Sequence, residues 1–125
     1  VGSYLGVHEG PQSISPLGFN VPLKPGMIIS NEPGYYKTGE YGIRIENLVI
    51  VRSSQFEEEE RPMLTLETIT LAPIDTRLIN AHMMSTAEIT WLNIYHATVR
   101  EHIAPLLKGE EKDWLINATM AITTL

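Results

Sequence analysis

The spacing of the apolar residues changes along this chain of 125 residues, and the change predicts two kinds of structure. Up to about residue 72, short apolar runs are broken by Pro and Gly, which is typical of strands joined by tight turns. From Ser85 onward the apolar residues recur every three or four positions, the period of an amphipathic helix. We therefore predict an α+β fold, with antiparallel strands over residues 1–72 and a helical C-terminal extension over residues 73–125, packed together as one compact unit.

Turn residues divide the first part of the chain into short strands. Lys24, Pro25 and Gly26 have the spacing of a type II turn, in which proline precedes a glycine with positive φ. A hairpin loop is expected at residues 37–40, where the chain reverses direction. The strands predicted around these turns cover residues 27–31, 41–52 and 63–71.

Two carboxylates, Glu32 and Glu46, close apolar runs at positions where a globular protein normally has hydrocarbon. With the period of a strand, Glu46 shares a face with Arg44, Leu48 and Ile50, so charged groups and core residues are expected together on that face. An ionised carboxylate among aliphatic neighbours needs a compensating cation or several donors. A metal ion or an arginine should therefore lie nearby. Antiparallel pairing could bring the two carboxylates within reach of one ion, but the register is left open.

The second part of the chain begins with a strong helix signal. Ser85 and Glu88 have the spacing of a capping box, in which each side chain accepts a hydrogen bond from the other residue's backbone N–H. A helix should therefore start at about residue 86, and Pro105 should end or kink it. Its expected apolar stripe, flanked by Trp91 and Tyr95, consists of Ile89, Leu92, His96, Val99 and Ile103.

A second, shorter helix is predicted over residues 111–121. Gly109 is a residue at which the preceding helix can end. Acidic residues around the first turn of the second helix suit the positive end of its dipole. Trp114 and Leu115 are expected to be buried. Neither helix carries a catalytic grouping.

The composition excludes several classes of function. A net charge of -6 and an acidic run at residues 57–60 argue against a nucleic-acid groove. Because the chain has no cysteine, any metal must be bound through oxygen and imidazole. No apolar stretch approaches the ~20 residues of a membrane span, and no segment resembles a signal peptide, so a cytoplasmic protein is expected.

Of the four histidines, His8 is the candidate for a functional role. It precedes a Gly-Pro pair in an extended segment, where a side chain can be directed into a cleft. His96 and His102 fall within the first predicted helix, and His82 falls in a connection, so packing or surface roles are expected for these three.

Three blocks of sequence, in this order, carry a resemblance to a known family. They are GSYLGVHEGP at residues 2–11, KPGMIISNEPGYY at residues 24–36 and YGIRIENL at residues 41–48. Together they resemble the catalytic domain of aminopeptidase P, the Xaa-Pro aminopeptidases of metallopeptidase family M24 with the pita-bread fold. The remainder, from residue 64 to Leu115, resembles the C-terminal extension of the longer, cytosolic-type branch, so the resemblance covers nearly the whole chain.

The resemblance implies specific roles for five residues. In that family two divalent ions, commonly manganese, share a bridging hydroxide and are held by two aspartates, one histidine and two glutamates. Glu32 and Glu46 match the two glutamate ligands, and Glu32 would also carry a proton. His8 matches the histidine that stabilises the scissile carbonyl and the transition state. Tyr36 and Arg44 match partners close to the ligands.

The implied activity is removal of the N-terminal residue that precedes proline in a peptide, by an enzyme that tends to form homodimers. The family's metal histidine lies in a Gly-His-Gly element that would fall just before Val1, and both aspartates lie farther upstream. We therefore expect the 125 residues alone neither to hold a dinuclear centre tightly nor to hydrolyse peptides. The alternatives are a prolidase-like or creatinase-like hydrolase of the same fold and a non-catalytic pita-bread binding module.

Overall fold

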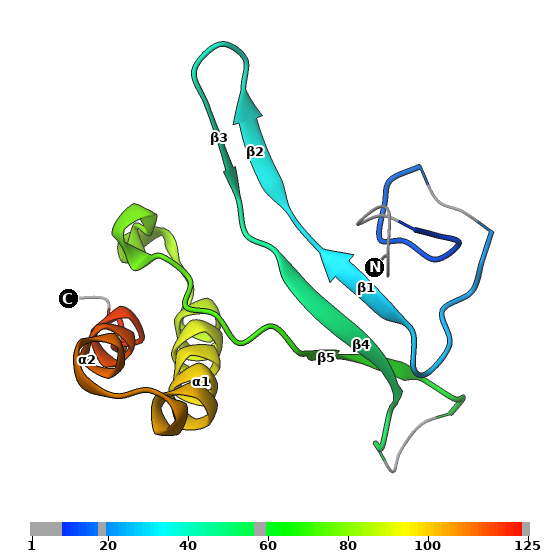
Figure 1. Cartoon of the computed structure of the whole chain (residues 1–125). Coiled ribbons are helices and arrows are strands. Elements are labelled where there is room, and N and C mark those ends of the chain that lie inside the picture. The colour runs from blue at the N-terminus through cyan, green and yellow to red at the C-terminus, as the bar shows by residue number, and fades with distance from the viewer. Residues whose placement is uncertain (1–8, 18–19, 57–59, 124–125) are drawn as a thin grey trace. The chain divides into compact units, whose positions relative to one another are not determined.

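The computed structural model describes residues 9–17, 20–56 and 60–123, with strands in the first part of the chain and helices in the second (Figure 1). This order confirms the predicted α+β class. The chain divides into two compact units, residues 1–70 and residues 71–125, which are described separately below.

The first unit contains two small antiparallel sheets. In the three-stranded sheet β4 lies between β1 and β5, while β2 and β3 form a hairpin. The strands are β1 (Ile28–Asn31), β2 (Gly34–Lys37), β3 (Tyr41–Arg44), β4 (Asn47–Ser53) and β5 (Leu64–Thr68). The core of this unit is formed by Ile29, Val49 and Val51, with exposed fractions of 3% or less.

The turn that leads into β1 has the predicted geometry. The backbone N–H of Met27 donates to the carbonyl of Lys24 over 3.2 Å, which closes a four-residue turn. Gly26 takes φ +90°, the value that a type II turn requires at this position and that side chains disfavour. Gly39, with φ +74°, serves the same purpose in the loop of the β2–β3 hairpin.

The predicted strand over residues 41–52 is divided in two, and Pro33 explains the division. The backbone N–H of Ile45 donates to the Pro33 carbonyl over 3.2 Å, but proline has no N–H with which to complete the pair. The ladder is therefore interrupted between β3 and β4, although the two strands run on as one ribbon in Figure 1.

The expected sharing of one face by charges and core residues is only partly correct. Leu48 and Ile50 are half-buried, whereas the fully buried residues of β4 are Asn47, Val49 and Val51 on the alternate positions. The main core therefore packs on the other face of the strand.

The second unit is built around two helices, α1 (Thr86–Ile103) and α2 (Gly109–Ala118). The capping box at the start of α1 is confirmed: Ser85 N donates to Glu88 Oε2 over 2.7 Å, and Glu88 N donates to Ser85 Oγ over 3.3 Å. The hydrogen bonds that the Glu88 carboxylate accepts from the backbone N–H and from the hydroxyl of Ser85 lower its pKa. Short 3-10 turns precede and follow α1, at Thr76–Leu78, Ala81–Met83 and Ala104–Leu106.

The buried side of α1 follows the predicted stripe, with Leu92, Tyr95, His96 and Val99 enclosed. None of the helices among the described residues combines the length and the apolar character that crossing a bilayer requires.

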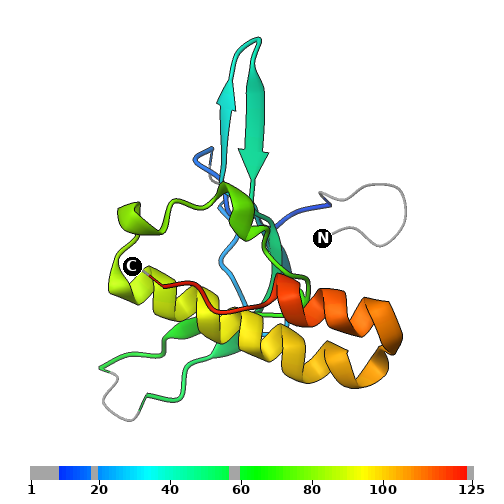
Figure 2. The ribbon, with the colours of Figure 1, turned by 90° about the vertical axis from the view of Figure 1, so that its left-hand side faces the viewer.

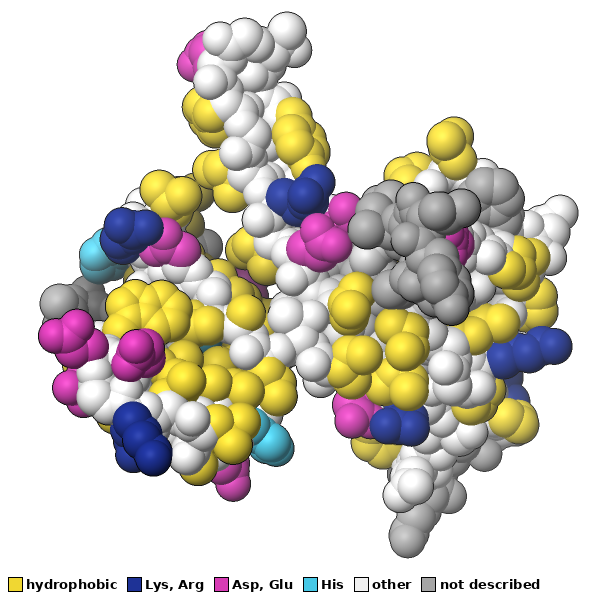
Figure 3. Space-filling model, in the orientation of Figure 1, with side chains coloured by type: hydrophobic (Ala, Val, Ile, Leu, Met, Phe, Trp, Pro, Cys, Tyr) yellow, Lys and Arg dark blue, Asp and Glu magenta, His cyan; other side chains and the backbone are white. Residues whose placement is uncertain are grey.

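Three predictions that concern α2 are wrong. Trp114 is 61% exposed, so only Leu115 of the pair is buried; apolar side chains are plainly visible on the surface of the helical unit in Figure 3. Gly109, with φ +54°, does not stop a helix but opens α2, which ends at Ala118 and not at residue 121.

The C-terminal tail is fastened to α1 through one amide side chain. Asn93 Nδ2 donates to the Ile122 carbonyl and Asn93 Oδ1 accepts from the Ile122 N–H, each over 2.9 Å. Arg100 donates to the carbonyl of Thr119 at the end of α2. These bonds explain why α2 lies beside α1 and the tail runs back along it (Figure 2).

His96 is fully enclosed in the helical unit, with an exposed fraction of 0%. Its Nε2 accepts a hydrogen bond from the Ile74 N–H over 3.0 Å, so the neutral ring carries its proton on Nδ1. Among the described residues Nδ1 has no hydrogen-bond partner. Burial lowers the pKa of His96 below 6.5, and the positive charge of Arg100 lowers it further.

We expect acid to weaken the helical unit through His96. Because the unfolded chain takes up this proton more readily than the folded one, the contribution of neutral His96 is complete above about pH 6.5 and is lost as the pH falls toward its folded-state pKa. In that interval the free energy of unfolding should fall by up to about 1.4 kcal/mol per pH unit. Urea denaturation of wild type and His96→Leu between pH 5 and 8 measures this slope, which should be reduced in the variant.

His102→Gln is the matched control, because His102 lies on an exposed part of the same helix. Equal pH slopes for wild type and His96→Leu would show that His96 does not titrate in this way.

Candidate active site

One register runs through the β1–β4 and β2–β3 ladders of the first unit. The pairing of β1 with β4 ends at Asn31 opposite Asn47, and the pairing of β2 with β3 begins at Gly34 opposite Arg44. Two residues lie between the ladders on each strand, so no bulge shifts the register. Glu32 is therefore directly opposite Glu46.

The hydrogen bond between Ile45 and Pro33 also fixes the type of pair that the two glutamates form. Hydrogen-bonded and non-hydrogen-bonded residue pairs alternate along an antiparallel ladder. Because Ile45 bonds to Pro33, the neighbouring Glu32 and Glu46 form a non-hydrogen-bonded pair, the kind with Cα atoms about 4.5 Å apart and closer side chains. Opposed residues in such a pair direct their side chains to the same face.

Arg44 lies beside the two carboxylates and supplies the compensating positive charge that the sequence predicts. Its Nε is 3.3 Å from Glu46 Oε2, and its Nη1 is 3.9 Å from Glu32 Oε2. A hydrogen bond with the Tyr36 hydroxyl, together with the negative charges of Glu46 and Glu32, raises the pKa of Arg44. In Figure 3 a basic and an acidic side chain meet at the base of the projecting β2–β3 hairpin.

The two carboxylates differ in their surroundings. The side chain of Glu32 is 27% exposed, whereas that of Glu46 is 43% exposed. Ser30 Oγ donates a hydrogen bond of 2.9 Å to Glu32 Oε1, which orients this carboxylate. Sequence reasoning missed Ser30, although a hydroxyl two positions before Glu32 on a strand necessarily shares its face.

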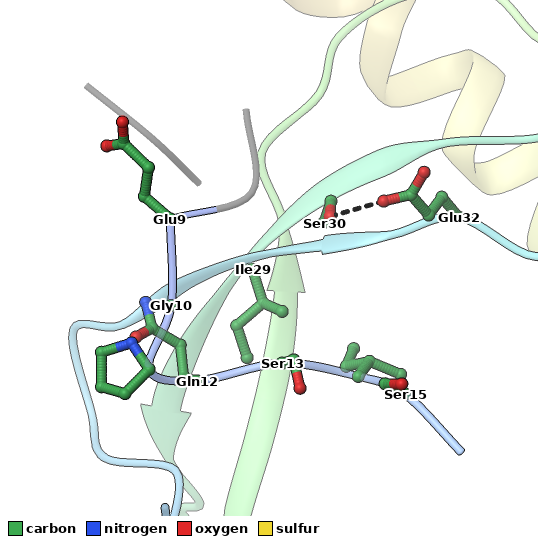
Figure 4. A pocket seen from close by; sticks show the side chains of 10 residues that line it. Glu9, Gly10, Gln12, Ser13, Ser15, Ile29, Ser30 and Glu32 are labelled. Atoms are coloured by element: carbon green, nitrogen blue, oxygen red, sulfur yellow. Dashed lines mark hydrogen bonds between the residues drawn. The ribbon is translucent and has the colours of Figure 1, made fainter. Parts of the chain in front are cut away.

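A cavity of about 650 Å³ adjoins Glu32. It is lined by residues 9–15, Ile29, Ser30 and Glu32, so an extended segment forms one wall and the end of β1 the other (Figure 4). Gln12 Nε2 donates a hydrogen bond of 3.4 Å to the Ile28 carbonyl, which connects the extended segment to β1. A carboxylate thus borders a space large enough for a small ligand.

The predicted site residues Glu32, Tyr36, Arg44 and Glu46 come together on one ribbon, whereas His8 lies outside the described residues. In the described part of the chain no group of three or more acidic or histidine side chains is placed to hold a metal ion. The carboxylate pair offers hard oxygen ligands of the kind that suit magnesium, calcium or manganese. The two carboxylates could therefore serve as two of the ligands of a divalent ion, together with further ligands.

Comparison with known families divides the chain into two matched regions. Residues 1–53 match metallopeptidase family M24. Residues 62–122 match the C-terminal region of peptidase_M24.

Known proteins resemble the chain over nearly its whole length. It is 47% identical to "Aminopeptidase P2" of Arabidopsis thaliana over 95% of the chain and 17% of that protein, and 43% identical to "Probable Xaa-Pro aminopeptidase P" of Coprinopsis cinerea over 98% of the chain and 21% of that protein. The chain therefore spans about a fifth of the length of these relatives.

A solved structure also matches. It is the crystal structure of X-prolyl aminopeptidase from Caenorhabditis elegans, described as a cytosolic enzyme with a di-nuclear active site. The TM-score is 0.83 and the sequence identity 34%, over 97% of this chain and 20% of that one. The match confirms the predicted partial pita-bread fold.

We expect the Nε–H proton of Arg44 to be protected from exchange with water, because Nε contacts the Glu46 carboxylate at 3.3 Å. Glu46→Gln should accelerate this exchange, since the remaining contact with Glu32 is longer and involves Nη1. Exchange measured by NMR on the arginine side chains gives the rates.

Glu40→Gln removes a carboxylate of the same hairpin that pairs with Lys37, and it should leave the Arg44 proton unaffected. An equal effect of both variants would argue against a specific contact between Arg44 and Glu46.

Proposed function

Since this chain belongs to metallopeptidase family M24 and corresponds to the C-terminal region of aminopeptidase P, we propose that it supplies part of the active site of an enzyme that removes the N-terminal residue preceding proline. The observation that carries the proposal is the opposed pair of Glu32 and Glu46, with Arg44 in contact with both carboxylates. The pair lies outside the main core, which packs on the other face of the ribbon.

In this proposal Glu32 and Glu46 are two ligands of a centre that takes two divalent ions, manganese in the first place. The di-nuclear active site of the nematode relative and the hard oxygen character of carboxylates support it. When bound, the ions would supply positive charge and an activated water for hydrolysis, and we assign to them the bridging hydroxide of the family. The remaining ligands would come from outside these 125 residues.

The side chains of this chain would orient the centre and move protons. Ser30 holds one oxygen of Glu32, which leaves the other directed toward Arg44. Arg44 and Tyr36 would keep the carboxylates in place, and Glu32 would carry a proton from the attacking water toward the leaving amine. His8 would donate a hydrogen bond to the oxygen of the scissile carbonyl as negative charge develops on it.

The cavity beside Glu32 is the proposed place for part of the peptide substrate. Its wall carries backbone and small polar side chains from residues 9–15, which suit hydrogen bonding to an extended peptide. We further propose that the complete enzyme is a cytoplasmic homodimer, and the description of the nematode relative as cytosolic supports the location.

The 125-residue chain alone should bind manganese weakly and should not cleave Xaa-Pro peptides. It supplies two carboxylate ligands and places an arginine in contact with both, which competes with an added cation. Titration calorimetry with MnCl₂ and an assay with an Arg-Pro-Pro peptide test this. Stoichiometric binding at submicromolar concentration, with cleavage, would contradict it.

A chimera in which this chain replaces the matching C-terminal part of the Arabidopsis relative should cleave Xaa-Pro peptides when manganese is present. Glu32→Gln and Glu46→Gln should each lower kcat/KM at least about a hundredfold, because losing a ligand forfeits several kcal/mol of metal-dependent stabilisation. Glu40→Gln is the matched control, since Glu40 pairs with Lys37 at the hairpin loop. Full activity of both ligand variants would refute the assignment.

Substrate length should separate this activity from that of a prolidase-like or creatinase-like relative. The match of residues 62–122 to the C-terminal region favours aminopeptidase P. We expect the chimera to prefer a Xaa-Pro-Pro tripeptide to a Xaa-Pro dipeptide, as measured by the ratio of the two kcat/KM values. A preference for the dipeptide, or for creatine, would assign another activity, and binding without cleavage would indicate a non-catalytic module.

A further inference from the structure

Six residues of the ribbon share one face, and two of them are glycines. In the register described above, Glu32 opposes Glu46, Gly34 opposes Arg44, and Tyr36 opposes Gly42. Positions two apart on a strand lie on the same face, as do opposed residues, so these three pairs form a single row. Arg44 stands in the middle of the row, with carboxylates on one side and Tyr36 on the other.

The Tyr36 ring lies flat over both glycines. A Cβ atom at Gly42 would stand 2.7 Å from Cδ1 of this ring. A Cβ atom at Gly34 would stand 2.8 Å from the Tyr36 hydroxyl oxygen and 2.9 Å from Cε2. These separations are too short for real carbon contacts, so the ring occupies the space that a side chain would take at either position.

The backbone itself does not require glycine at these two positions. Among the described glycines, positive φ is found at Gly26, Gly39 and Gly109, and not at Gly34 or Gly42. Glycine within a strand lowers stability, because it loses more conformational freedom on folding and packs no side chain. The contact with the Tyr36 ring is therefore the feature that distinguishes these positions.

The place of the ring determines what its hydroxyl can reach. Tyr36 is 63% exposed, so little besides the two glycines confines its ring to the ribbon. From this position over Gly34 the hydroxyl lies next to Arg44, which opposes Gly34 in the ladder and contacts Glu46 and Glu32. A ring turned into solvent would leave Arg44 held from the carboxylate side alone.

We propose that Gly34 and Gly42 are positioning residues, which form a flat seat for the Tyr36 ring and thereby hold its hydroxyl next to Arg44, the partner of Glu32 and Glu46. The consequence for catalysis rests on the function proposed above. The seat itself is a property of the folded chain and can be tested without activity.

The first test uses the 125-residue chain and NMR. The α-protons of Gly34 and Gly42 should show upfield ring-current shifts that disappear in Tyr36→Leu. Gly42→Ala should abolish the shift at Gly34 and move the Arg44 Nε–H signal, while the urea midpoint stays unchanged because an exposed ring can rotate away. Unshifted glycine protons, or an unmoved Arg44 signal in Gly42→Ala, would overturn the proposal.

The second test is a double-mutant cycle in the chimera. Gly42→Ala and Tyr36→Phe should each lower kcat about 10- to 100-fold with little change in KM, the loss expected when a partner of a metal ligand is removed. Phe keeps the ring on its seat but lacks the hydroxyl. In Tyr36→Phe, the further change Gly42→Ala should therefore cost no additional activity.

The outcomes distinguish the two proposals. Additive losses in the cycle would show that Gly42→Ala acts through general disruption, and the positioning role would be rejected. An inactive chimera with the expected NMR shifts would reject the proposed function and leave the seat established. An active chimera in which Gly42→Ala leaves kcat and KM unchanged would support the proposed function and reject the positioning role.

Discussion

The register of the antiparallel ribbon is the constraint on which the candidate site depends. A slip of one residue would move every side chain of one strand to the opposite face. Val49 and Val51 of β4 pack with Ile29 of β1 in the core, so the slip would also expose buried valine and isoleucine. The hydrophobic core thus sets the alignment of β1 and β4, and the same alignment places Glu32 opposite Glu46.

Charge compensation follows from this alignment. Two carboxylates ~4 Å apart would repel each other by about 4 kcal/mol at an effective dielectric constant near 20. Arg44 lies two residues before Glu46 on the same face of the ribbon, and it contacts both carboxylates and offsets the repulsion. In a complete metal centre the ions would provide the same positive charge. The arginine is then a partner that keeps each carboxylate oriented, and the glycines beneath Tyr36 limit the positions that the arginine can take.

The helical unit is organised by side chains that bond to backbone far away in the sequence. Tyr95 donates to the Ala72 carbonyl over 2.8 Å and His96 accepts from the Ile74 N–H, so neighbouring residues of α1 hold the segment that enters this unit. Asn93 holds the tail that leaves it. Burial raises the pKa of Tyr95 and lowers that of His96, and in both cases it favours the neutral form that makes these bonds.

Local signals in the sequence determined the turn at Gly26, the capping box of Ser85 and Glu88 and the existence of strands before helices, because each depends on neighbours within a few residues. The sequence motifs also pointed to the family and to the residues that meet on the ribbon. Only the tertiary structure decided the division of the strand opposite Pro33, the contact of Arg44 with both carboxylates and the exposure of Trp114. A period of two or of 3.6 fixes which residues share a face, but long-range packing decides which face is covered.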